Sequence, residues 1–236
     1  MSLILTAMIV VTAFLALYWV FYGQRKHNEM MNPKRKTELK AILFDLDGVI
    51  IDSFEAWFSV FNQLRKKYNL KEISKEEFRK KVWGGSVERD AKEFFNNLDP
   101  KVLKKEYEKL MGKNAKKTKL NGDAEKVLKA IKHKKFKIGL VTNSPGSIVN
   151  KILNFHKIDK YFDVVITADD VEKAKPYPDP ILKACEKLKV MPDEIMYVGD
   201  TKIDYKAGKS AGAFVVGLNT HGDLVISRLR DLLQLL

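Results

Sequence analysis

Two aspartates separated by one residue, Asp45 and Asp47, follow a short apolar run of the chain. Side chains two positions apart at the end of a strand project to the same side, so both carboxylates can overhang one edge of a sheet, and Gly48 allows a sharp turn there. Two carboxylates about 4 Å apart repel each other by roughly 4 kcal/mol at an effective dielectric constant near 20. The pair therefore indicates a site that holds a positively charged group.

A second acidic pair could supply the rest of an ion site. Asp200, preceded by Gly199, ends another apolar run, and Asp204 follows four residues later. Carboxylate oxygens without histidine or cysteine ligands favour Mg²⁺ over Zn²⁺, and the four histidines are too far apart in the sequence to form a cluster. We expect Mg²⁺ to be the cofactor.

Two further segments of the sequence supply polar groups that could belong to the same site: a hydroxyl and an amide in one, and an ammonium in the other. Thr142 and Asn143 end a third apolar run, and Lys175 lies in a segment with three prolines in five residues. Each element alone has a plainer explanation: a strand-end aspartate can cap a helix, a threonine can close a turn, and a lone lysine is usually solvated. Because all of them fall at the strand ends of one predicted parallel sheet, they converge on one crevice and favour a phosphoryl-transfer site.

Five apolar runs, rich in Val and Ile and without alternation, are typical of parallel strands that are covered on both faces. They cover residues 41–44, 137–143, 164–168, 194–200 and 213–218. Helix-like stretches at 124–134, 147–155 and 180–188 alternate with them. The alternation predicts an α/β fold with a doubly wound, Rossmann-like parallel sheet, whose ligand lies at the carboxyl ends of the strands.

Residues 53–123 interrupt this alternation, because they are charged, nearly free of strand signals and helical in their periodicity. We expect them to form a helical cap inserted into a catalytic core made of residues 40–52 and 124–236. Within the cap, residues 83–86 either form a loop that faces the active site or a plain turn between two helices.

The first residues of the chain pose a different problem. Residues 3–22 carry no charge, and a helix of that length spans about 30 Å, the thickness of a bilayer's hydrocarbon core. Three aromatic residues at the far end and five basic residues after them are typical of a membrane boundary. The sequence predicts a transmembrane anchor over 1–23, a basic linker over 24–39, and a catalytic domain on the cytoplasmic side.

Two alternatives to this anchor remain open. A cleaved signal peptide would need a basic region before a shorter apolar run, and neither is present. A start at Met30 or Met31 would instead give a soluble cytoplasmic domain. The single cysteine, Cys185, excludes an internal disulfide and is expected to be a small buried apolar residue.

The formal net charge of +13 is concentrated in parts of the chain, since residues 101–135 carry thirteen basic and four acidic residues. A lysine-dense cap could attract an anionic small molecule, although lysine- and glutamate-rich surfaces are also common in heat-adapted proteins. The basic helices lack interleaved aromatic residues, so we expect no nucleic-acid partner. The sequence does not indicate an oligomeric state.

The motifs together resemble those of a known superfamily. The set Asp45-x-Asp47-Gly-Val, Thr142, Lys175 and Gly199-Asp200-x-x-x-Asp204 is similar to the four motifs of the haloacid dehalogenase-like (HAD) superfamily, in its phosphoglycolate phosphatase and beta-phosphoglucomutase branch. The resemblance covers about residues 40–220 and does not include the N-terminal segment. It implies a Rossmann-like core with a helical cap after the first motif.

The resemblance also implies a role for each acid. Asp45 would attack phosphorus and form an aspartyl-phosphate, and Asp47 would act first as a general acid and then as a general base. Mg²⁺ would be held by Asp45, the backbone carbonyl of Asp47 and Asp200. Asp204 would position the ion or its waters.

The remaining motif residues would contact the phosphoryl group. By the same resemblance, Thr142 and the amide of Asn143 would hold phosphoryl oxygens, and Lys175 would neutralise the nucleophile and the phosphate. Other candidates for substrate contact are the turn glycine and four cap residues: Gly48, Trp57, Trp83, Ser86 and Arg89.

These features favour a Mg²⁺-dependent phosphatase that hydrolyses a small phosphorylated metabolite. The dehalogenase branch needs neither the metal nor the second acid, and mutase members carry a histidine ten residues after the acid–base aspartate, where this chain has Trp57. A sugar phosphomutase and a membrane-tethered, non-catalytic scaffold remain the alternatives. Phosphoglycolate, a sugar phosphate, a nucleotide and pyrophosphate all satisfy the motifs.

Overall fold

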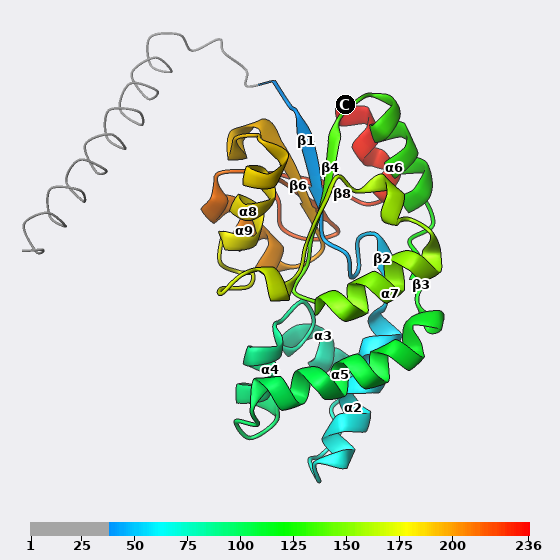
Figure 1. Ribbon diagram of the computed structural model, residues 1–236, viewed down its shortest axis with the longest axis vertical. Coiled ribbons are helices and arrows are strands. Elements are labelled where there is room, and N and C mark those ends of the chain that lie inside the picture. The colour runs from blue at the N-terminus through cyan, green and yellow to red at the C-terminus, as the bar shows by residue number, and fades with distance from the viewer. Residues whose placement is uncertain (1–37) are drawn as a thin grey trace, which may run out of the picture. The chain divides into compact units, whose positions relative to one another are not determined.

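The computed structural model describes residues 38–236 (Figure 1). The predicted anchor and residues 24–37 of the predicted linker lie outside the described residues. Among the helices that are described, none combines the length and the apolar composition needed to cross a bilayer.

A six-stranded sheet forms the centre of the described chain, and every neighbouring pair of its strands is parallel. In spatial order the strands are β5 (Val164–Ile166), β4 (Lys137–Val141), β1 (Ala41–Phe44), β6 (Ile195–Gly199), β7 (Phe214–Leu218) and β8 (Leu224–Ile226). The predicted parallel sheet is thus confirmed, and its five predicted strands match to within two residues at each end. Strand β8 was not predicted, because it is short and two of its three residues are exposed.

The central strand β1 is buried on both faces, which explains its uninterrupted apolar sequence. Ile42 and Phe44 belong to one hydrophobic cluster, and Ala41 and Leu43 belong to the other. The register pairs Phe44 with both Leu140 of β4 and Val198 of β6. These three strands therefore end at the same level of the sheet.

Helices cover both faces of this sheet (Figure 1). They are α6 (Ala124–His133), α7 (Gly146–His156), α8 (Asp179–Leu188) and α9 (Lys202–Ala211), with short 3-10 helices η2 (Asp159–Tyr161), η3 (Ala168–Asp170), η4 (Pro192–Glu194) and η5 (Leu229–Leu235). Cys185 of α8 is buried in the cluster that includes Leu43, and burial raises the pKa of its thiol to about 11. The thiol therefore has the character of a small apolar core residue.

Four helices fill the segment predicted to form the cap: α2 (Phe54–Lys67), α3 (Lys75–Lys81), α4 (Val87–Phe94) and α5 (Pro100–Asn114), followed by η1 (Ala115–Lys117). The chain enters and leaves them through a two-stranded antiparallel ribbon of β2 (Ile51–Asp52) and β3 (Lys119–Leu120). Phe61 belongs to an aromatic cluster, with its ring centroid 5.3 Å from that of Phe78 and 5.2 Å from that of Phe95. The strands of the sheet run toward this helical end (Figure 1).

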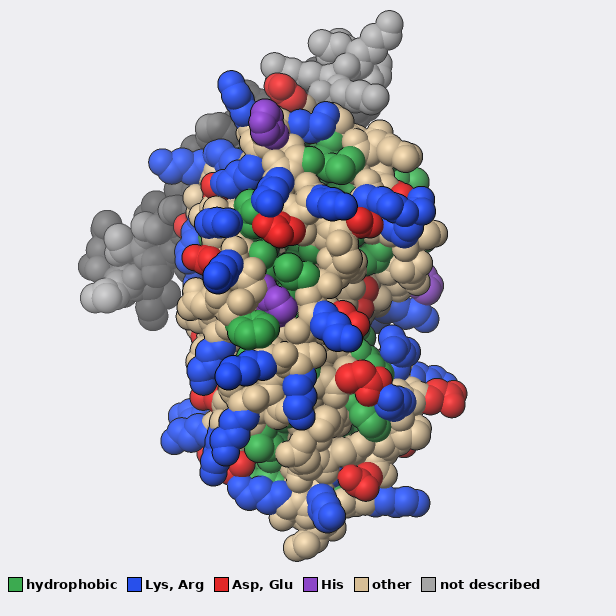
Figure 2. Space-filling view, turned by 90° about the vertical axis from the view of Figure 1, so that its right-hand side faces the viewer, with side chains coloured by type: hydrophobic (Ala, Val, Ile, Leu, Met, Phe, Trp, Pro, Cys, Tyr) green, Lys and Arg blue, Asp and Glu red, His purple; other side chains and the backbone are tan. Residues whose placement is uncertain are grey.

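Lysine and arginine side chains are spread over the face shown in Figure 2, with acidic side chains between them. Several charged side chains of the described residues form exposed ion pairs, such as Lys104 with Asp169 and Lys132 with Asp163. Exposed pairs contribute little to stability, about 1 kcal/mol or less each. On this face the positive charge does not gather into one patch.

Candidate active site

The predicted site residues lie at the carboxyl ends of three neighbouring strands. Asp45 follows β1, Thr142 follows β4 and Asp200 follows β6, and the shared register brings these three ends level. The loop before α8 brings in Lys175, and the first turn of α9 brings in Asp204. One edge of the sheet therefore gathers groups that are up to 159 residues apart in the chain, from Asp45 to Asp204.

The ammonium of Lys175 lies at the centre of this group. Its Nζ is 2.8 Å from Asp45 Oδ1 and 2.7 Å from Asp204 Oδ1, and it also donates to the hydroxyl of Tyr197 at 2.9 Å and the carbonyl of Val141 at 3.1 Å. The side chains of Lys175, Asp45 and Asp204 are at most 5% exposed. This lysine is a buried counter-ion and not a solvated surface residue.

Burial and repulsion act together on the acids. Burial raises the pKa of Asp45 well above its ordinary value, against the opposing effect of Lys175 and with the support of nearby carboxylates. Burial and then the charge of Asp204 raise the pKa of Asp200 to about 7. Burial alone would raise the pKa of Asp204 as well, but Lys175 holds it below its ordinary value. One ammonium therefore does not compensate all the carboxylates of the site.

The donor set fits a hard divalent cation such as Mg²⁺. Carboxylate oxygens of Asp45, Asp200 and Asp204 lie within 4.8 Å of one another. Asp200 Oδ1 is buried without a hydrogen-bond partner among the described residues, and such an orphaned oxygen is costly unless a ligand takes it. The backbone approaches closely here, since a Cβ on Gly48, at φ +85°, would lie 2.1 Å from Asp200 Oδ2.

Asp204 differs from the other acids because the protein already uses both of its oxygens. Oδ1 accepts from Lys175 and from Tyr197, and Oδ2 accepts from the backbone and hydroxyl of Thr201, which begins α9 with a capping box. In this arrangement Asp204 fixes the position of Lys175. Direct coordination of an ion by Asp204 stays a prediction.

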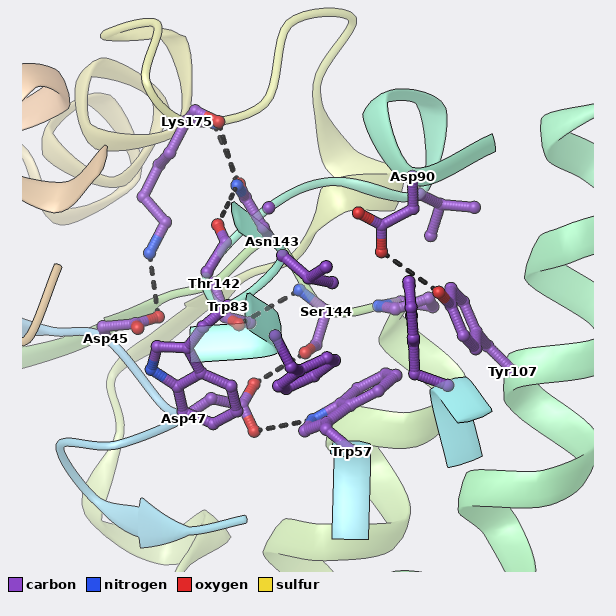
Figure 3. A pocket seen from close by; sticks show the side chains of 17 residues that line it. Asp45, Asp47, Trp57, Trp83, Asp90, Tyr107, Thr142, Asn143, Ser144 and Lys175 are labelled. Carbon is purple, nitrogen blue, oxygen red and sulfur yellow. Dashed lines mark hydrogen bonds and ion pairs between the residues drawn. The ribbon is translucent and has the colours of Figure 1, made fainter. Parts of the chain in front are cut away.

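Three donors hold the carboxylate of Asp47, and Figure 3 shows two of them, Trp57 and Ser144. Ser53 and Trp57 Nε1 donate to Oδ1, the latter at 3.0 Å, and Ser144 Oγ donates to Oδ2 at 2.7 Å. Trp57 belongs to α2 of the cap, whereas Ser144 follows β4 of the core. The position of the candidate acid–base residue therefore depends on both parts.

The side chain of Asn143 joins the site to the cap. Its Nδ2 donates to the carbonyls of Lys175 at 2.9 Å and Gly84 at 3.0 Å, and its Oδ1 accepts from the backbone N–H of Lys175 at 2.9 Å. Thr142 Oγ1 accepts from the backbone N–H of Ser144 at 3.1 Å. The side chain of Asn143 thus fixes the lysine loop, and its backbone amide stays the predicted phosphoryl contact.

A cavity lies between these core groups and the cap (Figure 3). Asp45, Asp47, Thr142 and Lys175 line it from the core. Trp57, Trp83 and the glycines of the predicted loop line it from the cap, and Trp83 Nε1 donates to Asp200 Oδ2 at 2.9 Å. The stretch 83–86 therefore faces the site in part.

Three predicted substrate residues do not line the cavity, namely Gly48, Ser86 and Arg89. Ser86 begins α4, where its hydroxyl accepts from the backbone N–H of Arg89. The Arg89 side chain lines an outer groove, together with Gly48 and Asp200, and does not line the cavity. Their contact with substrate stays a prediction.

The sequence did not point to Ser53, Ser144 and Tyr197, which bond carboxylates of the site, nor to Asp90 and Tyr107, which line the cavity from the cap. One signal was available: Tyr197 stands inside a buried strand that is otherwise apolar, and a buried phenol needs a hydrogen-bond partner. Ser53 and Ser144 lie in turns, where serine is ordinary and carries no comparable signal.

The comparisons with known proteins agree with this geometry. The family model described as haloacid dehalogenase-like hydrolase matches residues 42–218. A phosphoglycolate phosphatase of Aquifex aeolicus is 32% identical over 209 residues, which cover 84% of this chain and 97% of the relative. The pyrophosphatase PpaX of Anoxybacillus flavithermus is 32% identical over 213 residues, with the same coverage of 84% and 97%.

A solved structure extends the similarity to the fold. The HAD-superfamily hydrolase of subfamily IA from Geobacter sulfurreducens superposes with a TM-score of 0.66 at 25% identity, covering 84% of this chain and 100% of that chain. The similarity therefore includes the cap as well as the sheet.

The buried ammonium generates a prediction about stability. In the absence of divalent ions, Lys175→Met should lower the free energy of unfolding at pH 8 by about 3–5 kcal/mol, because two buried carboxylates lose their counter-ion. This loss of unfolding free energy should become smaller toward pH 5. Without the ammonium, the pKa values of Asp45 and Asp204 in the folded variant lie above their values in the unfolded chain. The folded variant therefore binds more protons as the pH falls, and this stabilises it. Urea unfolding at both pH values measures this difference.

Lys209→Met provides the matched control, because Lys209 forms an exposed pair with Asp223 at 2.8 Å. Lys209→Met should lower the free energy of unfolding by about 1 kcal/mol or less. Equal stability of Lys175→Met and the unmodified chain at pH 8 would contradict the assignment of Lys175 as the central counter-ion.

Proposed function

This chain belongs to the haloacid dehalogenase-like hydrolase family and is a phosphatase of that family; we propose that it hydrolyses a small phosphate monoester with Mg²⁺, through an aspartyl-phosphate on Asp45. The observation that carries this proposal is the position of Asp45. Asp45 lines the cavity, and its carboxylate lies 2.8 Å from the ammonium of Lys175 and within 4.8 Å of a carboxylate oxygen of Asp200, which has an orphaned oxygen.

The proposed reaction has two displacements. A carboxylate oxygen of Asp45 forms a bond to phosphorus while the ester P–O bond breaks, and Asp47 gives its proton to the leaving alkoxide. Asp47 then takes a proton from a water molecule, which attacks the aspartyl-phosphate, releases phosphate and restores Asp45.

Charge compensation is the main requirement of this reaction, because an anionic nucleophile has to approach an anionic ester. Lys175 touches the nucleophile directly and offsets part of the repulsion. Mg²⁺, when bound by Asp45, Asp200 and the backbone at residue 47, would supply the remaining positive charge.

The contact between Trp57 and Asp47 supports hydrolysis over phosphoryl transfer between sugar positions. The indole N–H donates to Asp47 Oδ1 and has no lone pair that could accept a proton. Trp57 can hold the acid–base carboxylate in place but cannot act as a second base. Water therefore remains the proposed acceptor of the phosphoryl group.

The nucleophile assignment gives a direct test. Asp45→Asn should abolish the release of phosphate from p-nitrophenyl phosphate while leaving the fold intact, because an amide cannot form the aspartyl-phosphate. Asp159→Asn, an exposed acid in η2, provides the control and should retain full activity. A folded Asp45→Asn variant that kept more than a few per cent of the activity would disprove the role of Asp45.

The orphaned oxygen of Asp200 generates a prediction that does not depend on turnover. Mg²⁺ should raise the thermal unfolding temperature, because an ion that binds only the folded chain at about 100 times its Kd stabilises it by about 2.7 kcal/mol. The shift should be smaller at pH 6 than at pH 8, since a carboxyl with a pKa of about 7 is largely protonated at the lower pH.

Asp200→Asn should reduce the Mg²⁺ shift, and EDTA should remove both the shift and the activity. The variant Asp223→Asn, at an exposed ion pair, serves as the control. A Mg²⁺ shift that is absent at pH 8, or equally large in Asp200→Asn, would count against the metal site.

The membrane anchor over 1–23 stays a prediction. If it is correct, the full chain should sediment with membranes and resist a carbonate wash, whereas a chain that starts at Met31 should remain in the supernatant. Recovery of the full chain in the soluble fraction without detergent would exclude the anchor and favour the later start.

A further inference from the structure

One loop of the cap bonds to two separate parts of the core site. It consists of residues 82–85, between α3 and α4, and is called the tryptophan loop below. Trp83 Nε1 donates to Asp200 Oδ2 at 2.9 Å, and the carbonyl of Gly84 accepts from Asn143 Nδ2 at 3.0 Å. Asp200 is a predicted ligand of Mg²⁺, and Asn143 fixes the lysine loop. The tryptophan loop therefore contacts the metal side and the lysine side of the site at the same time.

The bond from Trp83 determines how the carboxylate of Asp200 is oriented. Of the described residues, only Trp83 donates a hydrogen bond to this carboxylate. The bond occupies Oδ2 and leaves Oδ1 buried without a partner. Hydrogen bonds from outer residues orient the carboxylates that bind metal ions, and here one oxygen is fixed while the other is free for an ion. Because the donor belongs to the cap, the orientation of this predicted metal ligand depends on the position of the cap.

The tryptophan loop also packs closely against the core. Gly84 has a φ of +76°, and a Cβ at this position would lie 3.0 Å from Cγ2 of Thr201, closer than side-chain carbons ordinarily approach. Thr201 begins α9, and its hydroxyl donates to Asp204. The glycine therefore allows the close approach that brings the indole of Trp83 to Asp200.

The cap holds the same loop from the other side. The ring of Trp83 meets that of Phe54 edge to face, with the centroids 5.2 Å apart. The guanidinium of Arg89 donates to the carbonyl of Val82 and lies against Gly85, where it leaves no room for a side chain. The tryptophan loop is therefore fixed to the cap helices, and a movement of the cap would carry the indole with it.

We propose, building on the proposed Mg²⁺ site, that Trp83 is a positioning residue for the metal ligand Asp200 and couples binding of Mg²⁺ to closure of the cap. In the position described here, the indole N–H holds the carboxylate of Asp200 ready for the ion. A cap that moved away from the core would break this bond and lower the affinity for the ion. By linkage, the bound ion would favour the closed position of the cap by the same factor.

This coupling would make the enclosed site depend on the charge compensation that the reaction needs. The cap closes the cavity with apolar and aromatic side chains, among them Phe61 and Phe78. Exclusion of water strengthens the electrostatic interactions in a site, including the repulsion between Asp45 and an anionic ester. A cap that closes mainly when the ion is present would avoid the burial of uncompensated negative charge.

Trp83→Phe tests the bond itself, because the phenyl ring keeps an aromatic contact with Phe54 and lacks the indole N–H. In the full chain, the Kd for Mg²⁺ should rise by roughly 10- to 100-fold, the range expected when an outer partner of a metal ligand is lost. Isothermal titration calorimetry with MgCl₂ alone measures this change without turnover. An unchanged Kd would overturn the proposal.

Tyr107→Phe is the matched control, because it also removes one hydrogen-bond donor from an aromatic ring of the cap. The hydroxyl of Tyr107 donates to Asp90 at 3.1 Å, so the bond joins α5 to α4 within the cap and does not reach the core. Tyr107→Phe should leave the Kd for Mg²⁺ nearly unchanged. An equal loss of affinity in both variants would show that any disturbance of the cap weakens the binding of the ion, and would overturn the role of Trp83.

Hydrogen exchange of backbone amides tests the coupling to the cap. In the unmodified chain, saturating Mg²⁺ should slow exchange in residues 82–90, because the bound ion favours the closed cap. In Trp83→Phe, saturating Mg²⁺ should change exchange in these residues much less. Equal slowing in both chains, or no slowing in the unmodified chain when the ion is bound, would contradict the coupling.

A purely structural role of Trp83 has a different signature. Trp83→Phe would then lower the free energy of unfolding and leave the Kd for Mg²⁺ unchanged. We expect instead that the variant needs more Mg²⁺ for half of its maximal rate with p-nitrophenyl phosphate, while its rate at saturating Mg²⁺ changes much less. An equal loss of rate at all Mg²⁺ concentrations would show that Trp83 does not act through the ion, and the proposal would fail.

The two proposals fail separately. If the unmodified chain does not bind Mg²⁺, the metal site of the proposed function is contradicted. If the unmodified chain and Trp83→Phe bind Mg²⁺ with equal affinity, only the role of Trp83 is contradicted. If Trp83→Phe does not fold, the exchange experiment with the unmodified chain still decides whether the ion and the cap are coupled.

Discussion

Repulsion between buried carboxylates around one ammonium is the constraint on which the site depends. Lys175 binds Asp45 and Asp204 at 2.8 and 2.7 Å, and this leaves Asp200 with an oxygen that no described residue pairs. An arrangement with more buried negative than positive charge is unfavourable by itself. A divalent cation would compensate the excess of negative charge, so the same imbalance that is unfavourable for folding gives the site its affinity for the ion.

The sheet makes this arrangement possible because it holds together charged residues that lie far apart in the sequence. Strand β1 lies between β4 and β6, and their common register places the residues after all three at one level. The cap completes the site from the other side. Two indole N–H groups, those of Trp57 and Trp83, each bond a carboxylate of the core.

The site residues whose positions could be predicted from the sequence have one physical feature in common. Asp45, Thr142 and Asp200 each come directly after a buried apolar strand, so the sheet alone determines where they lie. Asp90 is different, because its place beside the cavity depends on how α4 packs against α5. The sequence pattern shows α4 as a charged helix and does not reveal which of its acids is turned inward.

During synthesis on the ribosome, the central strand of the sheet is made long before the two strands that pair with it. Strand β1 leaves the ribosome first, while its two partners begin only at residues 137 and 195. At about 5–20 residues per second, both edges of this apolar quartet stay unpaired for on the order of ten seconds. The four cap helices end at Asn114, before β4 begins, so they can pack on one another in that interval. The nascent chain therefore carries an ordered helical module and an open strand edge at the same time, and that edge is the segment most exposed to aggregation.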